Sequence, residues 1–92
     1  MNLTKGWKRF LGKDVVVDTD SPLTYIGKLD KVDDTFLIMT AVDVRDRSEG
    51  VATKERYVME ARKFGVRANR ETVLVRLDRV VSISLLKDVI EY

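Results

Sequence analysis

At 92 residues the chain is expected to form one domain, residues 1–92, because the length leaves no material for a second hydrophobic core. Hydrophobic residues make up 45% of the sequence and charged residues 35%, so the chain is expected to fold rather than stay disordered. The net charge is only +2, and the absence of cysteine and histidine excludes disulfide frameworks, the usual zinc sites and histidine-based catalytic triads.

A short amphipathic helix is predicted at the N-terminus. Apolar residues recur at helical spacing within residues 3–11, with basic residues between them. Gly12 follows the last apolar position and can adopt the left-handed conformation that ends a helix. We place the start near Asn2 or Thr4. Gly6 weakens such a helix by about 1 kcal/mol relative to alanine, so the helix should depend on docking its apolar face.

Five β-strands follow from the β-branched and apolar segments that turn residues separate. Gly27 lies inside the second segment and predicts a sharp bend or a close backbone approach. The pattern predicts a mostly β fold, a small, bent, five-stranded antiparallel barrel of the SH3-like type. The predicted strands are residues 14–19, 24–32, 35–44, 71–77 and 80–86.

Residues 46–70 form an insertion between the third and fourth predicted strands. The segment TKERYVMEARKFG predicts a helix, with Thr53 as its cap and Gly65 as its end. Arg56 and Glu60 can pair across one turn of that helix. The alternative is that the segment extends the two flanking strands into a long hairpin; we favour the helix.

Two short motifs carry a resemblance to a known family. The first is Gly27, Leu29 and Asp33, a glycine followed two residues later by an apolar residue and six residues later by an aspartate. The second is Val75-Arg76-Leu77 ahead of a final apolar strand. With these motifs the chain resembles the Sm-like family of small bent barrels, over about residues 2–43 and 71–86, as a divergent bacterial or archaeal member.

The resemblance implies a uridine pocket that is incomplete in this sequence. In the family an aromatic side chain stacks on the base, an asparagine bonds to its edge, an arginine packs on the other side, and the aspartate orients these groups. Thr35 and Leu37 stand at the aromatic and asparagine positions, and Leu77 replaces a glycine that gives the nucleotide room. Base stacking is worth about 1–3 kcal/mol, so little uridine preference is expected. Asp33 is then more an orienting and turn-forming residue than the floor of a uridine site.

The resemblance also implies a homo-oligomeric ring, in which the fourth strand of one subunit pairs with the fifth strand of the next. The final strand, VVSISLL, is long and apolar, and such an edge associates unless a partner covers it. Five, six or seven subunits are compatible with the sequence.

Charge is unevenly distributed along the chain. Residues 1–13 carry four basic and no acidic groups, residues 14–43 two basic and seven acidic, and residues 44–70 eight basic and four acidic. Two positive zones can present a basic face to a polyanion, although a solvated mixed surface is the simpler interpretation. The favoured function is RNA binding, mainly through backbone contacts. The predicted contact residues are Arg76, Asp33, Lys5, Lys8, Arg9, Lys54, Arg56, Arg62, Lys63, Arg67 and Arg70.

Two other functions, a protein scaffold and an enzyme, are alternatives to RNA binding. A protein scaffold would use Tyr57, Met59 and Phe64 of the inserted helix as an apolar docking face, unless these residues pack on their own barrel. An enzyme or metal site would need the acidic pairs at residues 18/20 and 33/34, but both pairs fall at expected turns without a nucleophile or base. We therefore predict no catalysis, no metal and no cofactor. No apolar run spans a membrane or makes a signal peptide, so a cytoplasmic location is expected.

Overall fold

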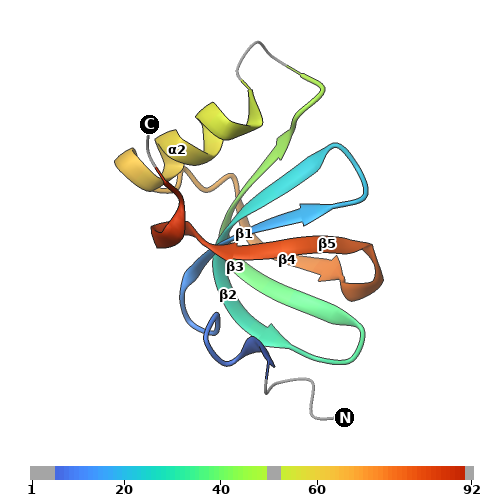
Figure 1. Ribbon diagram of the computed structural model, residues 1–92. Helices are drawn as coiled ribbons and strands as arrows, with labels where there is room; N and C mark the ends of the chain where they lie inside the picture. The colour runs from blue at the N-terminus through green and yellow to red at the C-terminus, as the bar shows by residue number, and fades with distance from the viewer. Residues whose placement is uncertain (1–5, 50–52, 91–92) are drawn as a thin grey trace.

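The computed structural model describes residues 6–49 and 53–90 and shows five antiparallel strands in one strongly bent sheet (Figure 1). The strand order is β4-β3-β2-β1-β5, so β4 and β5 form its two edges. The predicted barrel is therefore open within one chain. The elements in chain order are β1 (Asp14–Thr19), β2 (Leu23–Val32), β3 (Phe36–Asp46), α2 (Lys54–Phe64), β4 (Arg70–Arg76), η1 (Leu77–Arg79), β5 (Val80–Leu85) and η2 (Leu86–Asp88).

β1 is buried on both faces, which explains its run of three valines. Val15 and Val17 are fully buried in the main core, where β2, β3, β4 and β5 also contribute apolar side chains. Val16 points the other way, into a second cluster that includes Ile26, Tyr57 and other residues of α2. Side chains alternate between the two faces of a strand, so a continuous apolar run requires cover on both faces. Here α2 supplies the second cover.

The inserted helix lies where the sequence predicts it, between β3 and β4. The Thr53 hydroxyl accepts a hydrogen bond from the backbone N–H of Arg56, and this N-cap satisfies one of the free N–H groups of the first turn. Gly65 ends the helix with φ +94°. Tyr57, Val58 and Ala61 are the buried residues of α2, so this face packs on its own sheet.

The predicted N-terminal helix is largely absent from the described residues. Gly6 and Trp7 are helical, whereas residues 8–12 form turns; the expected start near residues 2–4 lies outside the part of the chain that the structure describes. Gly12 has φ +76°, the left-handed conformation predicted for it, and its N–H donates to the carbonyl of Leu29 on β2 at 2.7 Å. The predicted docking does occur, because Trp7, Phe10 and Leu11 pack against the main core.

Both edge strands keep one side unpaired within the described chain. β4 pairs with β3 alone and β5 with β1 alone. Leu74 on β4 is 53% exposed and Val81 on β5 is 69% exposed, which is high for large apolar side chains. In the residues that the structure describes, no helix combines the length and the hydrophobicity needed to cross a membrane.

Candidate nucleic-acid interface

The β2–β3 turn is built around the carboxylate of Asp33. Its Oδ1 accepts hydrogen bonds from the backbone N–H of Thr35 at 2.8 Å and of Phe36 at 2.7 Å. These two bonds, the one from Phe36 foremost, hold the pKa of the Asp33 carboxyl below its usual range because they favour the charged form. Asp33 thus shapes the turn between the two strands. Asp34 beside it is exposed.

The β4–β5 connection lies directly beside this turn. The backbone N–H of Leu77 donates to the carbonyl of Thr35 at 2.9 Å, and Arg76 is the register partner of Phe36. The two motifs that carry the family resemblance, about 40 residues apart in sequence, therefore meet in space. The Arg76 guanidinium is 2.8 Å from the carboxylate of Asp78. Both side chains are more than half exposed, so this ion pair contributes little stability and can release the arginine.

The side chains at this place do not include the aromatic and amide groups that the resemblance leads one to expect. Leu37 is fully buried in the main core and faces away from any ligand. Thr35 is exposed but has no aromatic ring, and Leu77 packs against the core where a glycine would leave space. An arginine and a polar turn remain, and they can meet a phosphate or one face of a base.

Arg76 also lines a cleft of about 410 Å³ that sequence reasoning did not find. The β1–β2 turn forms its opposite wall, so its residues come from distant parts of the chain. Arg79 contributes a second guanidinium, which pairs with Asp20 at 2.8 Å. The only hint in the sequence is Asp78-Arg79, a polar pair between the fourth and fifth predicted strands that is typical of a tight connection. The lining residues are Thr19, Asp20, Ser21, Tyr25, Leu74, Val75, Arg76 and Arg79.

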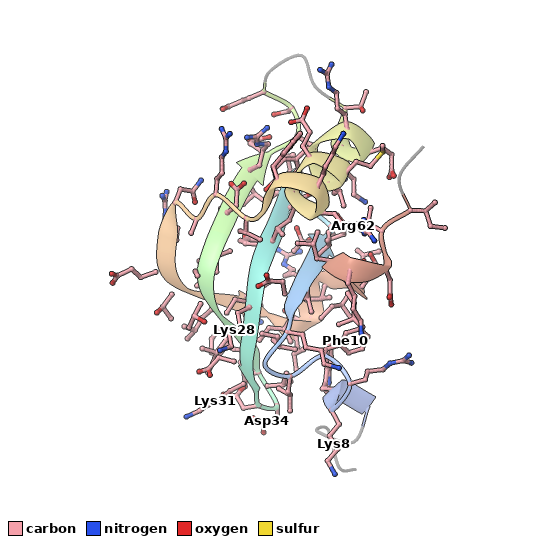
Figure 2. The ribbon with its side chains drawn as sticks, turned by 90° about the vertical axis from the view of Figure 1, so that its left-hand side faces the viewer. Lys8, Phe10, Lys28, Lys31, Asp34 and Arg62 are labelled. Carbon is pink, nitrogen blue, oxygen red and sulfur yellow. The ribbon has the colours of Figure 1, made fainter. Side chains whose placement is uncertain are left out.

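The predicted basic residues do not form one patch. Lys8 lies at the same end of the molecule as Lys31 and Asp34, whereas Arg62 lies toward the other end, on α2 (Figure 2). Arg9 stands 5.7 Å from the ring centre of Phe10 at the first of these ends. Lys5 lies outside the described residues. An extended polyanion would have to cross the molecule, or a set of copies, to reach both groups.

Several of the basic residues predicted to contact RNA from the insertion form ion pairs or hydrogen bonds within the protein. Lys54 Nζ is 2.7 Å from Asp18 Oδ2 and joins α2 to β1. Arg56 pairs with Glu60 at 3.2 Å along the helix, and Arg62 donates to the carbonyl of Lys87 at 3.1 Å. Arg70 donates to the carbonyl of Asn69. Of the insertion, Lys63 and Arg67 make no ion pair within the described residues.

A second pocket, of about 240 Å³, opens between α2 and the end of β3. Arg45 stacks over Tyr57 in its wall, 4.2 Å from the guanidinium carbon to the ring centre. Burial is the main reason that the pKa of Tyr57 is raised above its usual value, and the nearby Asp43 carboxylate adds to the effect. Arg45 was missed because its sequence neighbourhood reads only as the polar end of a strand. The lining residues are Asp43, Arg45, Tyr57, Glu60, Ala61, Phe64, Gly65 and Arg67.

Three of the four aspartates considered as metal ligands, Asp18, Asp20 and Asp33, make contacts within the protein. Asp18 accepts from Lys54, from the Ser82 hydroxyl at 3.1 Å and from the Thr24 hydroxyl at 3.3 Å. Asp20 pairs with Arg79. Within the described part of the chain, no three acidic side chains cluster as they would around an ion.

The fold compares closely with two solved structures. The structure of the Pyrococcus abyssii Sm protein in complex with a uridine heptamer matches with a TM-score of 0.61 and 19% identity, covering 92% of this chain and 99% of that one. A chain in the crystal structure of the NatC complex bound to CoA matches with a TM-score of 0.59 and 22% identity, covering 97% of this chain and 94% of that one. No protein-family model and no curated protein matches the sequence. The strand order, the bend at Gly27 and the structural match over 92% of the chain together establish that this chain has the Sm fold.

Proposed function

We propose that the protein is a ring-forming, non-catalytic RNA-binding protein that contacts mainly the RNA backbone. The observation that carries the proposal is the meeting of the β2–β3 turn and the β4–β5 connection, which leaves Arg76 exposed beside a turn fixed by Asp33. A solved structure with this fold holds a uridine heptamer. The missing aromatic and amide groups argue against a strong base preference here.

The ring part of the proposal is supported by the two open edges. β4 and β5 each present unpaired backbone groups, with Leu74 and Val81 exposed on them. Pairing β4 of one copy with β5 of the next is a head-to-tail contact that satisfies both edges and closes into a ring. In a ring of five to seven subunits each subunit would carry one copy of this weak cationic site, so that one RNA could contact several copies.

The test combines mass, absorbance and salt dependence. Light scattering should give a mass of five to seven subunits, and the freshly purified protein should show a raised 260/280 absorbance ratio. Affinity for a labelled single-stranded RNA should fall steeply with salt, because each neutralised phosphate releases counterions. The Arg76→Ala variant should bind more weakly, with a smaller salt slope. A monomer, or an RNA affinity that salt does not change, would overturn the proposal.

A protein scaffold is the second candidate. It is supported by the match to a chain of the NatC complex bound to CoA, because this fold then also occurs in a complex whose named ligand is not RNA. The burial of Tyr57 against the sheet weakens the version in which the inserted helix docks a partner through that residue, whereas Phe64 is 70% exposed. A clean protein partner and a low 260/280 ratio on purification would favour this candidate.

A further inference from the structure

The insertion brings an exposed aromatic side chain to the rim of the pocket beneath α2. Phe64 is the last residue of the helix and 70% exposed, because Gly65 turns the chain away immediately after it. Lys63 Nζ stands 5.4 Å from its ring centre. An exposed ring with a cation beside it is the combination that proteins use to stack bases of single-stranded nucleic acid. At the β2–β3 turn Thr35 has no ring, and the neighbouring Phe36 is partly buried.

Two arginines line the same pocket and are not neutralised by ion pairs within the described residues. The Arg45 guanidinium lies over the ring of Tyr57, and Arg67 lies in the segment that follows α2. Tyr57 is anchored in turn, since its hydroxyl donates to the carbonyl of Asp43 at 3.4 Å. A guanidinium is well matched to phosphate oxygens because of its planar fork of donors.

The acidic groups of the pocket are engaged elsewhere. Asp43 is only 6% exposed, and its Oδ1 accepts from the Asn69 side chain at 3.3 Å. Glu60 pairs with Arg56, which lies one helical turn earlier on α2. The lining carries two arginines and two carboxylates, so its formal charge is zero. The excess positive charge beside it comes from Arg56, which pairs with Glu60, and from Lys63 next to Phe64.

The pocket is smaller than the usual ligand pockets of about 300–1,000 Å³. A space of about 240 Å³ suits one phosphate and part of a sugar, while a base can lie outside on Phe64. Residues of α2 line the pocket, and α2 lies at the opposite end of the molecule from the β2–β3 turn (Figure 1). It is thus a separate place from the Arg76 site.

We propose that this pocket is a second nucleotide subsite, in which Phe64 stacks one base of a single-stranded RNA while Arg45 and Arg67 hold the adjoining phosphate. The inference rests on the proposed RNA-binding function and places a stacking group outside the Sm barrel itself. It gives the insertion the base contact that the Asp33–Arg76 site lacks.

The test measures the fluorescence anisotropy of labelled seven-nucleotide RNAs, one of uridine and one of adenine, with the full chain. Phe64→Leu keeps an apolar side chain but removes the ring, and it should weaken binding about tenfold, as loss of one stacked base does. Phe64→Trp should retain the affinity. Arg67→Ala should weaken binding and reduce the salt slope by about 0.7 for each phosphate lost. Glu60→Gln should tighten binding, because it removes the opposing carboxylate.

Lys87→Ala is the matched control, since it also removes one exposed positive charge but lies outside the pocket. It should change the affinity much less than Arg67→Ala. If the wild type binds neither RNA, the proposed function and the subsite both fail. If the wild type binds RNA and Phe64→Leu and Arg67→Ala bind equally well, only the subsite is overturned. An effect of Lys87→Ala as large as that of Arg67→Ala would also overturn it, because binding would then follow total charge.

Discussion

Gly27 on β2 lies against the backbone of Ala41 on β3, so closely that a Cβ on Gly27 would stand 2.9 Å from the Ala41 carbonyl oxygen. It would stand equally close to the Cα of Val42. The β2–β3 register shifts at this point, and Ala41 adopts a positive φ of 51°. The pair therefore marks where the two central strands bend together. This bend lets one sheet enclose the main core.

Replacing Gly27 with alanine should destabilise the protein. The new methyl group meets backbone atoms, which cannot move aside as a flexible side chain can. Overpacking typically costs about 1–3 kcal/mol, and we expect the upper part of that range in urea unfolding. Gly6→Ala is the control, because nothing lies within 4 Å of a Cβ there. Equal stabilities for the two variants would show that the close approach does not constrain the fold.

Replacing Ala41 with glycine should instead stabilise the protein. A non-glycine residue in the left-handed region costs about 1–2 kcal/mol, and glycine avoids this cost at the φ of +51°. The greater freedom of glycine in the unfolded chain offsets about 0.4–1 kcal/mol. We expect a net stabilisation of up to about 1 kcal/mol by urea unfolding. Ala68→Gly, at an exposed residue without a positive φ, should instead destabilise.

The turn at Asp33 should make stability depend on pH in the acid range. The folded state lowers the pKa of this carboxyl, so the ionised form stabilises the fold above the ordinary aspartate pKa of about 3.9. That contribution is lost as the pH falls through the lower folded-state pKa. Asp33→Ala should therefore be less stable than wild type at about pH 7 and approach it at about pH 2.5.

The control for this prediction is Asp34→Ala. The Asp34 side chain is exposed and accepts no hydrogen bond from the described residues. At about pH 7 this variant should lose much less stability than Asp33→Ala, because no hydrogen bond to the turn is removed. The measurement is the urea midpoint of each protein between about pH 7 and pH 2.5. If the stability difference between Asp33→Ala and wild type does not narrow as the pH falls, the role given to the Asp33 carboxylate is wrong.

The contact between Lys54 and Asp18 should hold α2 onto the sheet. Asp18 is 15% exposed at its side chain and would keep only its two hydroxyl donors if Lys54 were lost. We expect Lys54→Met to cost about 1 kcal/mol, since hydrogen bonds to charged groups contribute about 1.5–3 kcal/mol and solvent screening reduces this at a partly exposed lysine. Arg56→Ala breaks a more exposed pair on the same helix and should cost less than about 0.5 kcal/mol.

Charges on the edge strands should break the proposed ring. Leu74→Asp and Val81→Asp each place a carboxylate on an open edge, where pairing with another copy would bury it. Each variant should shift the mass from light scattering toward the monomer while the circular dichroism spectrum is retained. Ile90→Asp is the matched control, because Ile90 is 72% exposed but lies outside both edge strands. An unchanged mass for both edge variants would remove β4–β5 pairing from the proposal.

The strands and the inserted helix could be predicted from the sequence because their signals are local. β-branched runs, the turn residues and the Thr53 and Gly65 caps each act within a few residues. The N-terminal segment shows where such reasoning fails. Its apolar spacing is helical, but residues 8–12 form turns, and no local pattern reveals how Trp7, Phe10 and Leu11 dock on the sheet.

The sequence by itself determined the five strands, the inserted helix, the bend at Gly27, and the presence of Thr35 and Leu37 where the resemblance leads one to expect an aromatic residue and an asparagine. Only the tertiary structure decided which cations are available, because an ion pair such as Lys54–Asp18 joins residues far apart in the chain. The same holds for the pocket beneath α2. Arg45, Phe64 and Arg67 meet there because the helix packs across the sheet to cover Val16 and Ile26, and that burial fixes the position of residues whose sequence pattern shows only charge.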